Sequence, residues 1–220
     1  MGEGALHAGG GVRGASDAFA SLFYYMFTLG QTQGTHSGVM RQDLVGANYA
    51  LIEGCAVSEW SSYAGNFVGQ CRPNPDYWGA LLFHRLMGEK VLHVFSEDEG
   101  DVLVFGNCQR NASRGYVLLL LNLANETARV KLPLEGERDG SVLVRRYVLT
   151  ALNDDLTSGG LASRVLFNGE PLELLTHTPW VPPLNGEEET VAKASPVVSL
   201  PPLSIAFLEV DEELGACRDP

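Results

Sequence analysis

The chain has 220 residues, of which 45% are hydrophobic, enough to bury a sizeable core in one or two domains. It carries 27 acidic and 15 basic residues, a formal charge of -12, so a nucleic-acid partner would approach against a repulsive field. No apolar run is long enough to cross a bilayer, and the N-terminus has neither a basic segment nor a signal-type hydrophobic core. We therefore expect neither a nucleic-acid partner nor a transmembrane segment.

Two glycosylation sequons begin at Asn111 and Asn125, and the four cysteines form an even number compatible with disulfides. Both features indicate a secretory route, so we expect a secreted, lysosomal or vacuolar location, including peripheral attachment to a membrane. Each alone has a simpler explanation, because short sequons arise by chance and widely spaced cysteines are often buried thiols. A secreted protein needs a targeting signal, and a missing upstream half of the chain would supply it.

The first part of the chain predicts a loop and a helix. Residues 2–14 are rich in glycine and alanine, which suits a loop whose backbone approaches something closely. Ser16 suits the cap of the helix that follows, Asp17 its first turn and Gly30 its end. Apolar residues recur at i, i+3, i+4 and i+7 on the expected buried face, namely Phe19, Leu22, Phe23, Met26 and Phe27.

Residues 39–45 predict a short strand, and a long polar loop then runs to Arg72. Residues 74–76 combine a cap residue, a proline and an acidic side chain, which predicts the start of a second helix. Leu81, Leu82 and Leu86 would line its buried side, and Gly88 would close it. The front section thus amounts to two β/α units, if the residues just before Glu3 form a strand.

From Val91 onward, short β-type runs alternate with turn residues, a spacing typical of an antiparallel sandwich. The expected strands are residues 91–95, 101–107, 116–122, 128–132, 142–150, 165–167, 172–174 and 204–210, with a hairpin turn at Asn168-Gly169. We expect the acidic run 187–189 to be a solvated loop. Two β/α units cannot close an α/β barrel, which needs about eight such units, so we expect the chain to be part of a larger one.

Motifs along the whole chain carry a family resemblance. They are Gly2-Glu3 followed by Gly9-Gly10-Gly11, Met40-Arg41-Gln42, and residues 46–49, 74–78, 84–88, 106–108, 121–123, 166–169 and 202–205. In order and spacing they resemble the heparanase-like family of glycoside hydrolases, especially its plant-type β-glucuronidases. The resemblance implies α/β plus β: the last two β/α units of an incomplete (β/α)8 TIM barrel in residues 1–92, followed by an antiparallel β-sandwich in residues 93–220.

The resemblance also implies a retaining mechanism, in which two carboxyl groups about 5 Å apart share the chemistry. Glu3 matches the nucleophile at the end of the seventh barrel strand, the end where barrel enzymes place catalytic groups. The family's acid/base glutamate lies in an Asn-Glu pair on an earlier strand. The only such pair here, Asn125-Glu126, falls in the expected sandwich. We therefore expect the chain to supply the nucleophile and to be inactive alone.

Five further residues match the family's substrate contacts. Gly9 and Gly10 match glycines whose backbone N–H groups meet the carboxylate of glucuronic acid, where a side chain would hold the ligand away. Tyr49 matches a tyrosine whose hydroxyl reaches the same carboxylate, and Gln42 and Asn48 match neighbouring polar contacts. Ordinary turn chemistry is a serious alternative for Asn48.

The sequence departs from the family at Ala8, which is aromatic in the animal enzymes, and at Ala47, which is usually glycine. Leaving-group preference therefore does not carry over. Among the cysteines, Cys108 and Cys217 match the family's disulfide, while Cys55 and Cys71 form either a second bridge or a pair of free thiols. The five histidines show no metal-ligand spacing, so neither a metal nor a cofactor is expected.

Two hypotheses follow. In the first, the intact protein hydrolyses β-glucuronide linkages in glycans or small glucuronides, by endo or exo action, and its missing N-terminal barrel half completes the site. In the second, the chain is an inactive truncated homologue that serves as a glycan-binding or structural module. The acidic charge disfavours sulfated polyanions, so a glucuronidated arabinogalactan or a small aromatic glucuronide is the expected substrate.

Overall fold

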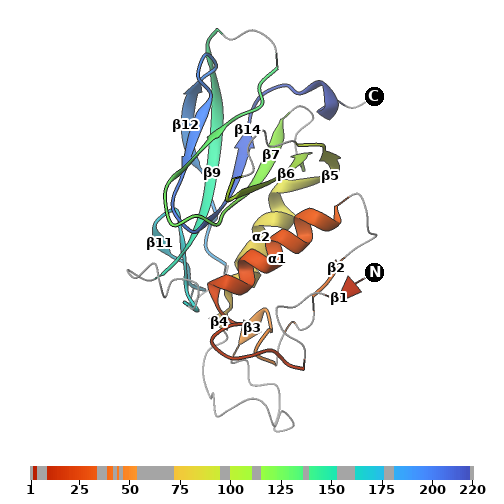
Figure 1. Ribbon diagram of the computed structural model, residues 1–220, viewed down its shortest axis with the longest axis vertical. Coiled ribbons are helices and arrows are strands. Elements are labelled where there is room, and N and C mark those ends of the chain that lie inside the picture. Colours follow the sequence, from red (N-terminus) through yellow and green to blue (C-terminus); the bar gives the residue numbers. More distant parts are fainter. Residues whose placement is uncertain are drawn as a thin grey trace. The chain divides into compact units, whose positions relative to one another are not determined.

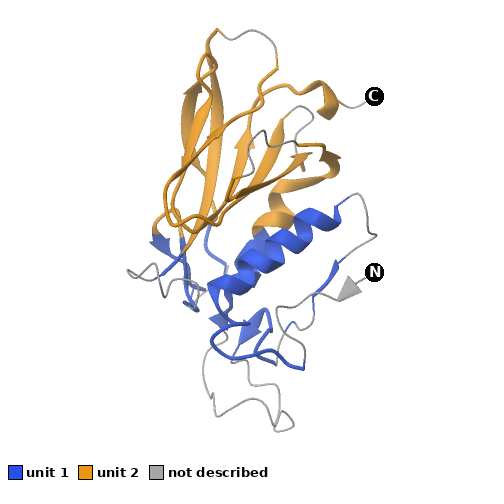
Figure 2. Cartoon of the chain, in the orientation of Figure 1, with its two compact units in different colours: residues 1–81, 151–166, 170–183 blue, residues 82–150, 167–169, 184–220 orange. Residues whose placement is uncertain are grey.

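The computed structural model describes the backbone of residues 2–3 and residues 9–33, 39–41, 44, 47–53, 72–94, 100–110, 115–135, 139–152, 162–175 and 181–218. The chain divides into two compact units, coloured separately in Figure 2. Unit 1 comprises residues 1–81, 151–166 and 170–183, and unit 2 comprises residues 82–150, 167–169 and 184–220. None of the described helices is long and apolar enough to span a bilayer.

Unit 1 contains a β/α/β arrangement. Strand β1 (Gly2–Glu3) runs parallel to β2 (Val39–Met40), and helix α1 (Phe19–Thr32) comes between them in the chain (Figure 1). In this register Glu3 pairs with Met40. Parallel strands need a crossover connection, and a helix is its usual form. The expectation of an α/β part followed by antiparallel strands is confirmed, while the assignment of the α/β part to the last two units of an incomplete (β/α)8 barrel and the domain limits at residues 92 and 93 stay predictions.

Helix α1 begins later and ends later than the sequence predicts. Ala18 occupies the N-cap, so Ser16 and Asp17 lie in the turn before the helix. There the Ser16 hydroxyl oxygen accepts a hydrogen bond from the Val12 N–H at 2.9 Å, and Asp17 accepts one from the Gly14 N–H. The two side chains therefore brace the preceding loop, because short polar side chains bond to nearby backbone as readily in turns as at caps.

The buried face of α1 also differs from its prediction. Phe19, Leu22 and Met26 are buried as expected, and Tyr25 joins them, but Phe27 is 37% exposed. The predicted end at Gly30 is wrong, since the helix continues to Thr32, whose hydroxyl donates to the Thr28 carbonyl. A Cβ on Gly79 of the second helix would collide with the Leu22 side chain, so the two helices approach closely at this point.

The second helix, α2 (Pro75–Leu86), follows a two-strand pair, β3 (Ile52–Glu53) with β4 (Arg72–Pro73). It starts where the sequence predicts, with Asp76 in its first turn. Asn74 acts differently from the expected cap, because its side-chain amide donates to the Ala50 carbonyl at 2.7 Å. The buried side carries Trp78, Leu82 and Leu86 at i, i+4 and i+8, whereas the predicted Leu81 is only half-buried. The helix ends at Leu86, so Gly88 belongs to the next strand.

Unit 2 is built on an antiparallel sheet, visible in Figure 1. Its strands lie in the order β9 (Ser141–Ala151), β14 (Ser204–Val210), β7 (Tyr116–Asn122), β6 (Val102–Gln109) and β5 (Met87–Leu92), and β12 (Glu187–Ala192) also pairs with β9. A second pair joins β8 (Ala128–Lys131) to β13 (Val197–Leu200). Asn168 and Gly169 turn the chain between β10 (Val165–Phe167) and β11 (Glu170–Pro171) with φ angles of 49° and 86°.

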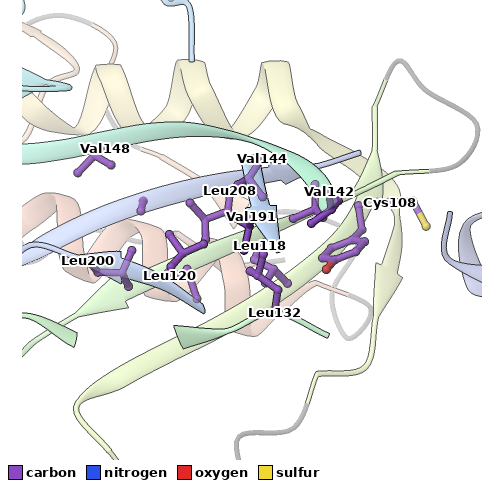
Figure 3. Packing of buried hydrophobic residues seen from close by; sticks show 14 of the residues in the cluster. Cys108, Leu118, Leu120, Leu132, Val142, Val144, Val148, Val191, Leu200 and Leu208 are labelled. Atoms are coloured by element: carbon purple, nitrogen blue, oxygen red, sulfur yellow. The ribbon is translucent and has the colours of Figure 1, made fainter. Parts of the chain in front are cut away.

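The large sheet and the β8–β13 pair of unit 2 share one hydrophobic core. Alternate residues of each strand point into it, as the two-residue period of a strand requires. Figure 3 shows part of this packing. The cluster contains Cys108, Tyr116, Leu118, Leu120, Leu132, Val142, Val144, Val148, Val191, Val198, Leu200, Ala206, Leu208, Val210 and Cys217. Two antiparallel layers around a common core are what a sandwich architecture requires.

The acidic run 187–189 forms the start of β12 and not the expected loop, although Glu187 and Glu188 are exposed to solvent as predicted. Arg145 pairs with Glu188 and Arg146 pairs with Glu189, each at 3.1 Å across the β9–β12 ladder. The partners are 43 residues apart in the chain. A run of like charge therefore becomes a strand when the neighbouring strand carries the opposite charge.

Candidate active site

The two parallel strands of unit 1 bring the predicted nucleophile to a shared edge of the sheet. Glu3 is the last residue of β1 and is paired in register with Met40, the last residue of β2. Because parallel strands end at the same edge, residues that follow β2, beginning with Arg41, are placed at the edge that holds Glu3. In α/β barrels this carboxyl edge is the one that carries catalytic groups.

A glycine loop lies against the segment that follows β2. Gly9, Gly10 and Gly11 all have positive φ, at 66°, 98° and 78°, a backbone conformation that a Cβ would strain. The Gly10 carbonyl accepts a hydrogen bond from the Asn48 N–H at 2.8 Å, and the Gly11 carbonyl accepts one from the Asn48 side-chain amide at 3.2 Å. Asn48 therefore holds the loop through both its backbone N–H and its side-chain amide. These two hydrogen bonds support the alternative that Asn48 serves the turn itself.

Tyr49 packs on the same loop. It is 6% exposed, and a Cβ on Gly11 would lie 2.9 Å from Tyr49 Cδ1 and from Ser16 Cβ. Among the described residues, a Cβ on Gly10 would meet only the Ala47 methyl, at 3.8 Å. The structure thus brings together the predicted residues Gly9, Gly10, Asn48 and Tyr49, whereas Gln42 lies outside the described residues.

A buried ion pair adjoins this group, formed by two residues that the sequence did not predict as part of the site. Arg41 pairs with Asp76 at 2.5 Å, and the two side chains are only 4% and 2% exposed. Ser21 donates a second hydrogen bond to the same Asp76 oxygen at 3.0 Å. Burial raises the pKa of the Asp76 carboxyl to about 6, although Arg41 and Ser21 oppose the rise. Desolvation likewise raises the pKa of Tyr25, whose ring faces Arg41.

The remaining predicted sites belong to unit 2 or lie outside the described residues. Asn125 and Glu126 are exposed in the turn between β7 and β8 of unit 2. Cys108 of β6 and Cys217 of the short helix η2 (Gly215–Cys217) form a disulfide with a Cα–Cα distance of 5.4 Å. No three His, Cys, Asp or Glu side chains of the described ranges gather as a metal ion would need. Asn111, Cys55 and Cys71 lie outside the described residues.

The chain is similar to curated proteins along nearly its whole length. It is 32% identical over 213 residues to baicalin-beta-D-glucuronidase of Scutellaria baicalensis, covering 96% of this chain and 36% of the relative. It is 31% identical over 235 residues to heparanase-like protein 2 of Arabidopsis thaliana, covering 93% and 39%. It is 31% identical over 228 residues to the heparanase of Mus musculus, covering 99% and 38%. No family model matches the chain.

Solved structures with a similar fold are glycoside hydrolases. The xylanase Xyn30A of Clostridium acetobutylicum, from glycoside hydrolase family 30 subfamily 8, matches with a TM-score of 0.57 at 10% identity, over 96% of this chain and 42% of that one. The alpha-L-arabinofuranosidase of Thermotoga maritima matches with a TM-score of 0.56 at 14% identity, over 90% and 39%. At such identities the similarity is one of fold.

The fold is thus similar to part of these TIM-barrel glycoside hydrolases and is consistent with a partial barrel. The chain belongs to the heparanase-like family of glycoside hydrolases. It spans little more than a third of the length of the curated relatives that it matches, between 36% and 39% for the three named above.

Proposed function

We propose that the protein containing this chain is a retaining β-glucuronidase in which Glu3 is the nucleophile and the glycine loop binds the carboxylate of glucuronic acid. The contact between Gly9–Gly11 and the Asn48–Tyr49 segment carries the proposal. This contact brings the backbone of the glycine loop close to a tyrosine in the segment that follows β2. Backbone N–H groups that no side chain covers can donate charge-assisted hydrogen bonds to an anion.

In this mechanism the Glu3 carboxylate attacks the anomeric carbon and displaces the leaving group, which a second carboxylic acid protonates. That acid/base group comes from a part of the protein that this chain does not supply. Water then hydrolyses the glycosyl-enzyme bond, and the sugar leaves with its original anomeric configuration. The names of the relatives, which include a beta-D-glucuronidase and several heparanases, support a glucuronide as the substrate.

A second candidate is a non-catalytic homologue that binds glycan or acts as a structural module. One observation favours it: the chain's only Asn-Glu pair lies in an exposed turn of unit 2, which has its own core and disulfide. Under this alternative, substitutions at the glycine loop would change glycan binding without affecting any turnover.

Glu3→Gln in the full-length protein distinguishes the two. If Glu3 is the nucleophile, replacing its carboxylate is expected to lower the kcat of the enzyme at least about 10³-fold, because no other group attacks the sugar. Glu53→Gln is the matched control, because Glu53 lies in the same unit and forms a partly exposed ion pair with Arg72 at 2.8 Å. Equal activity in the Glu3→Gln variant and the wild type would refute the assignment, and no turnover in either would favour the second candidate.

A further inference from the structure

Arg41 is held on several sides inside unit 1. Its guanidinium pairs with Asp76, and its Cζ atom lies 5.4 Å from the Tyr25 ring centroid and 5.8 Å from the Tyr49 ring centroid. Both distances fall within the range of a cation–π contact. The planar guanidinium can stack on a ring and form hydrogen bonds in its own plane at once, which a lysine ammonium cannot do.

The Asp76 end of this arrangement is also constrained. Its Oδ2 atom accepts hydrogen bonds from Arg41 and Ser21, whereas its buried Oδ1 has no hydrogen-bond partner among the described residues. A buried charge that loses its counter-ion is strongly destabilised, so Arg41 has little freedom to move away from Asp76. The ion pair therefore anchors the guanidinium in one position.

The Tyr49 ring contacts both Arg41 and the glycine loop. Arg41 meets the ring within 5.8 Å of its centroid, and Gly11 lies so close to Cδ1 that a Cβ there would come within 2.9 Å. Asn48, the neighbour of Tyr49, holds the carbonyls of Gly10 and Gly11. The orientation of the tyrosine and that of the loop are thus coupled through the same few contacts.

We propose that Arg41, anchored by Asp76, is a positioning residue that fixes Tyr49 against the glycine loop and so sets the preference for an anionic sugar over its neutral counterpart. The proposal rests on the proposed function, in which the Tyr49 hydroxyl reaches the sugar carboxylate. Arg41 acts through Tyr49, so its removal affects the binding of uronates and leaves the chemical step intact.

The test compares a nitrophenyl glucuronide with the matching nitrophenyl glucoside, using the full-length enzyme and the variants R41K, Y49F and R41K/Y49F. R41K keeps the charge but loses the planar stack. It is expected to raise KM for the glucuronide about tenfold, with kcat changed less than about threefold and the glucoside unaffected. In the Y49F background the same change is expected to add less than about twofold, because the hydroxyl that Arg41 positions is absent.

Arg72→Lys is the matched control, since Arg72 lies in the same unit in an ion pair whose arginine side chain is 49% exposed, and it is expected to leave both substrates unaffected. If R41K does not fold, S21A removes one hydrogen bond from Asp76 without touching a charge, and a KM increase of about threefold for the glucuronide alone is expected. An unchanged KM for the glucuronide in R41K, or in S21A if R41K does not fold, would overturn the inference. An equal rise in KM for the glucuronide and the glucoside would also overturn it. So would a full tenfold rise in KM of R41K/Y49F over that of Y49F. A wild-type enzyme without glucuronidase activity would instead overturn the proposed function.

Discussion

Asp76, in the first turn of α2, forms an ion pair with Arg41, the residue that follows β2, and both side chains are almost completely removed from solvent. The pair joins a helix to the edge of the parallel strands, where the candidate active-site residues gather. Burial raises the pKa of Asp76 to about 6, above its ordinary value of 3.8, so desolvation outweighs the attraction of Arg41.

This shift predicts a pH dependence of stability. When folding raises the pKa of a carboxyl group, that group stabilises the folded state fully at pH values below its pKa in the unfolded state. The stabilisation is lost as the pH rises through the pKa of the group in the folded state. For Asp76 the loss falls between about pH 4 and pH 6 and amounts to about 3 kcal/mol. Arg41, Ser21 and Tyr25 are among the groups that face this carboxyl.

Asp76→Asn removes the titration while keeping the size of the side chain. As the pH rises from 4 to 6, the free energy of unfolding of the wild type is expected to fall relative to that of the variant. Urea unfolding of both proteins at several pH values measures the difference. Parallel curves for the two proteins over this range would contradict the assignment of the raised pKa to Asp76.

Gly11 and Gly14 provide a matched pair of substitutions. Their φ angles are nearly equal, at 78° and 77°, so alanine strains the backbone equally at both, by about 1–2 kcal/mol. At Gly14 the new Cβ would meet no atom of the described residues within 4 Å, whereas at Gly11 it would lie 2.9 Å from Tyr49 Cδ1.

Gly11→Ala is therefore expected to destabilise by about 1–3 kcal/mol more than Gly14→Ala, because overpacking is added to the strain. It should also raise KM for a glucuronide about tenfold by displacing Tyr49, while Gly14→Ala leaves KM unchanged. Thermal unfolding and steady-state kinetics of the full-length variants give both results. Equal effects of the two substitutions would show that the loop is not packed on Tyr49 as described.

The disulfide between Cys108 and Cys217 closes a sequence separation of 109 residues. In the chain-entropy model, a loop of this length contributes about 4–5 kcal/mol to stability. The double substitution C108A/C217A is expected to lower the midpoint of unfolding of unit 2, without changing KM for a glucuronide, because the site residues lie in unit 1. An unchanged midpoint would indicate that the native contacts of η2 alone retain the C-terminal segment.

The formal charge of -12 leads to a prediction about polyanions. A strongly acidic surface repels sulfated glycans, most of all at low ionic strength, where screening is weak. This chain is therefore expected to pass unretained through a heparin column at about 0.1 M salt. Salt-sensitive retention would contradict the expected preference for less charged glucuronides, and a chondroitin sulfate column would show whether the retention is specific for heparin.

Local patterns predicted much of the fold and only part of the candidate site. The strands β7, β10 and β14 begin and end where the alternation of apolar and turn residues places them. Strand β12 escaped prediction because its acidic run is stabilised by Arg145 and Arg146 of another strand. The Arg41–Asp76 pair escaped for the same reason, since a contact over 35 residues has no local signature. Family resemblance, by contrast, predicted both Gly10 and Asn48 as site residues, and the structure joins them by a hydrogen bond.

Covalent trapping of Glu3 tests the account's central claim most directly. A fluorinated glucuronide with a good leaving group reacts with the nucleophile of a retaining enzyme and leaves a glycosyl-enzyme ester that hydrolyses slowly. With the full-length enzyme, we expect the intact mass to increase by one fluoroglucuronosyl group and peptide mapping to locate that group on Glu3. An active enzyme that carries the label on another carboxylate, or that turns over glucuronides without accumulating any label, would contradict the claim.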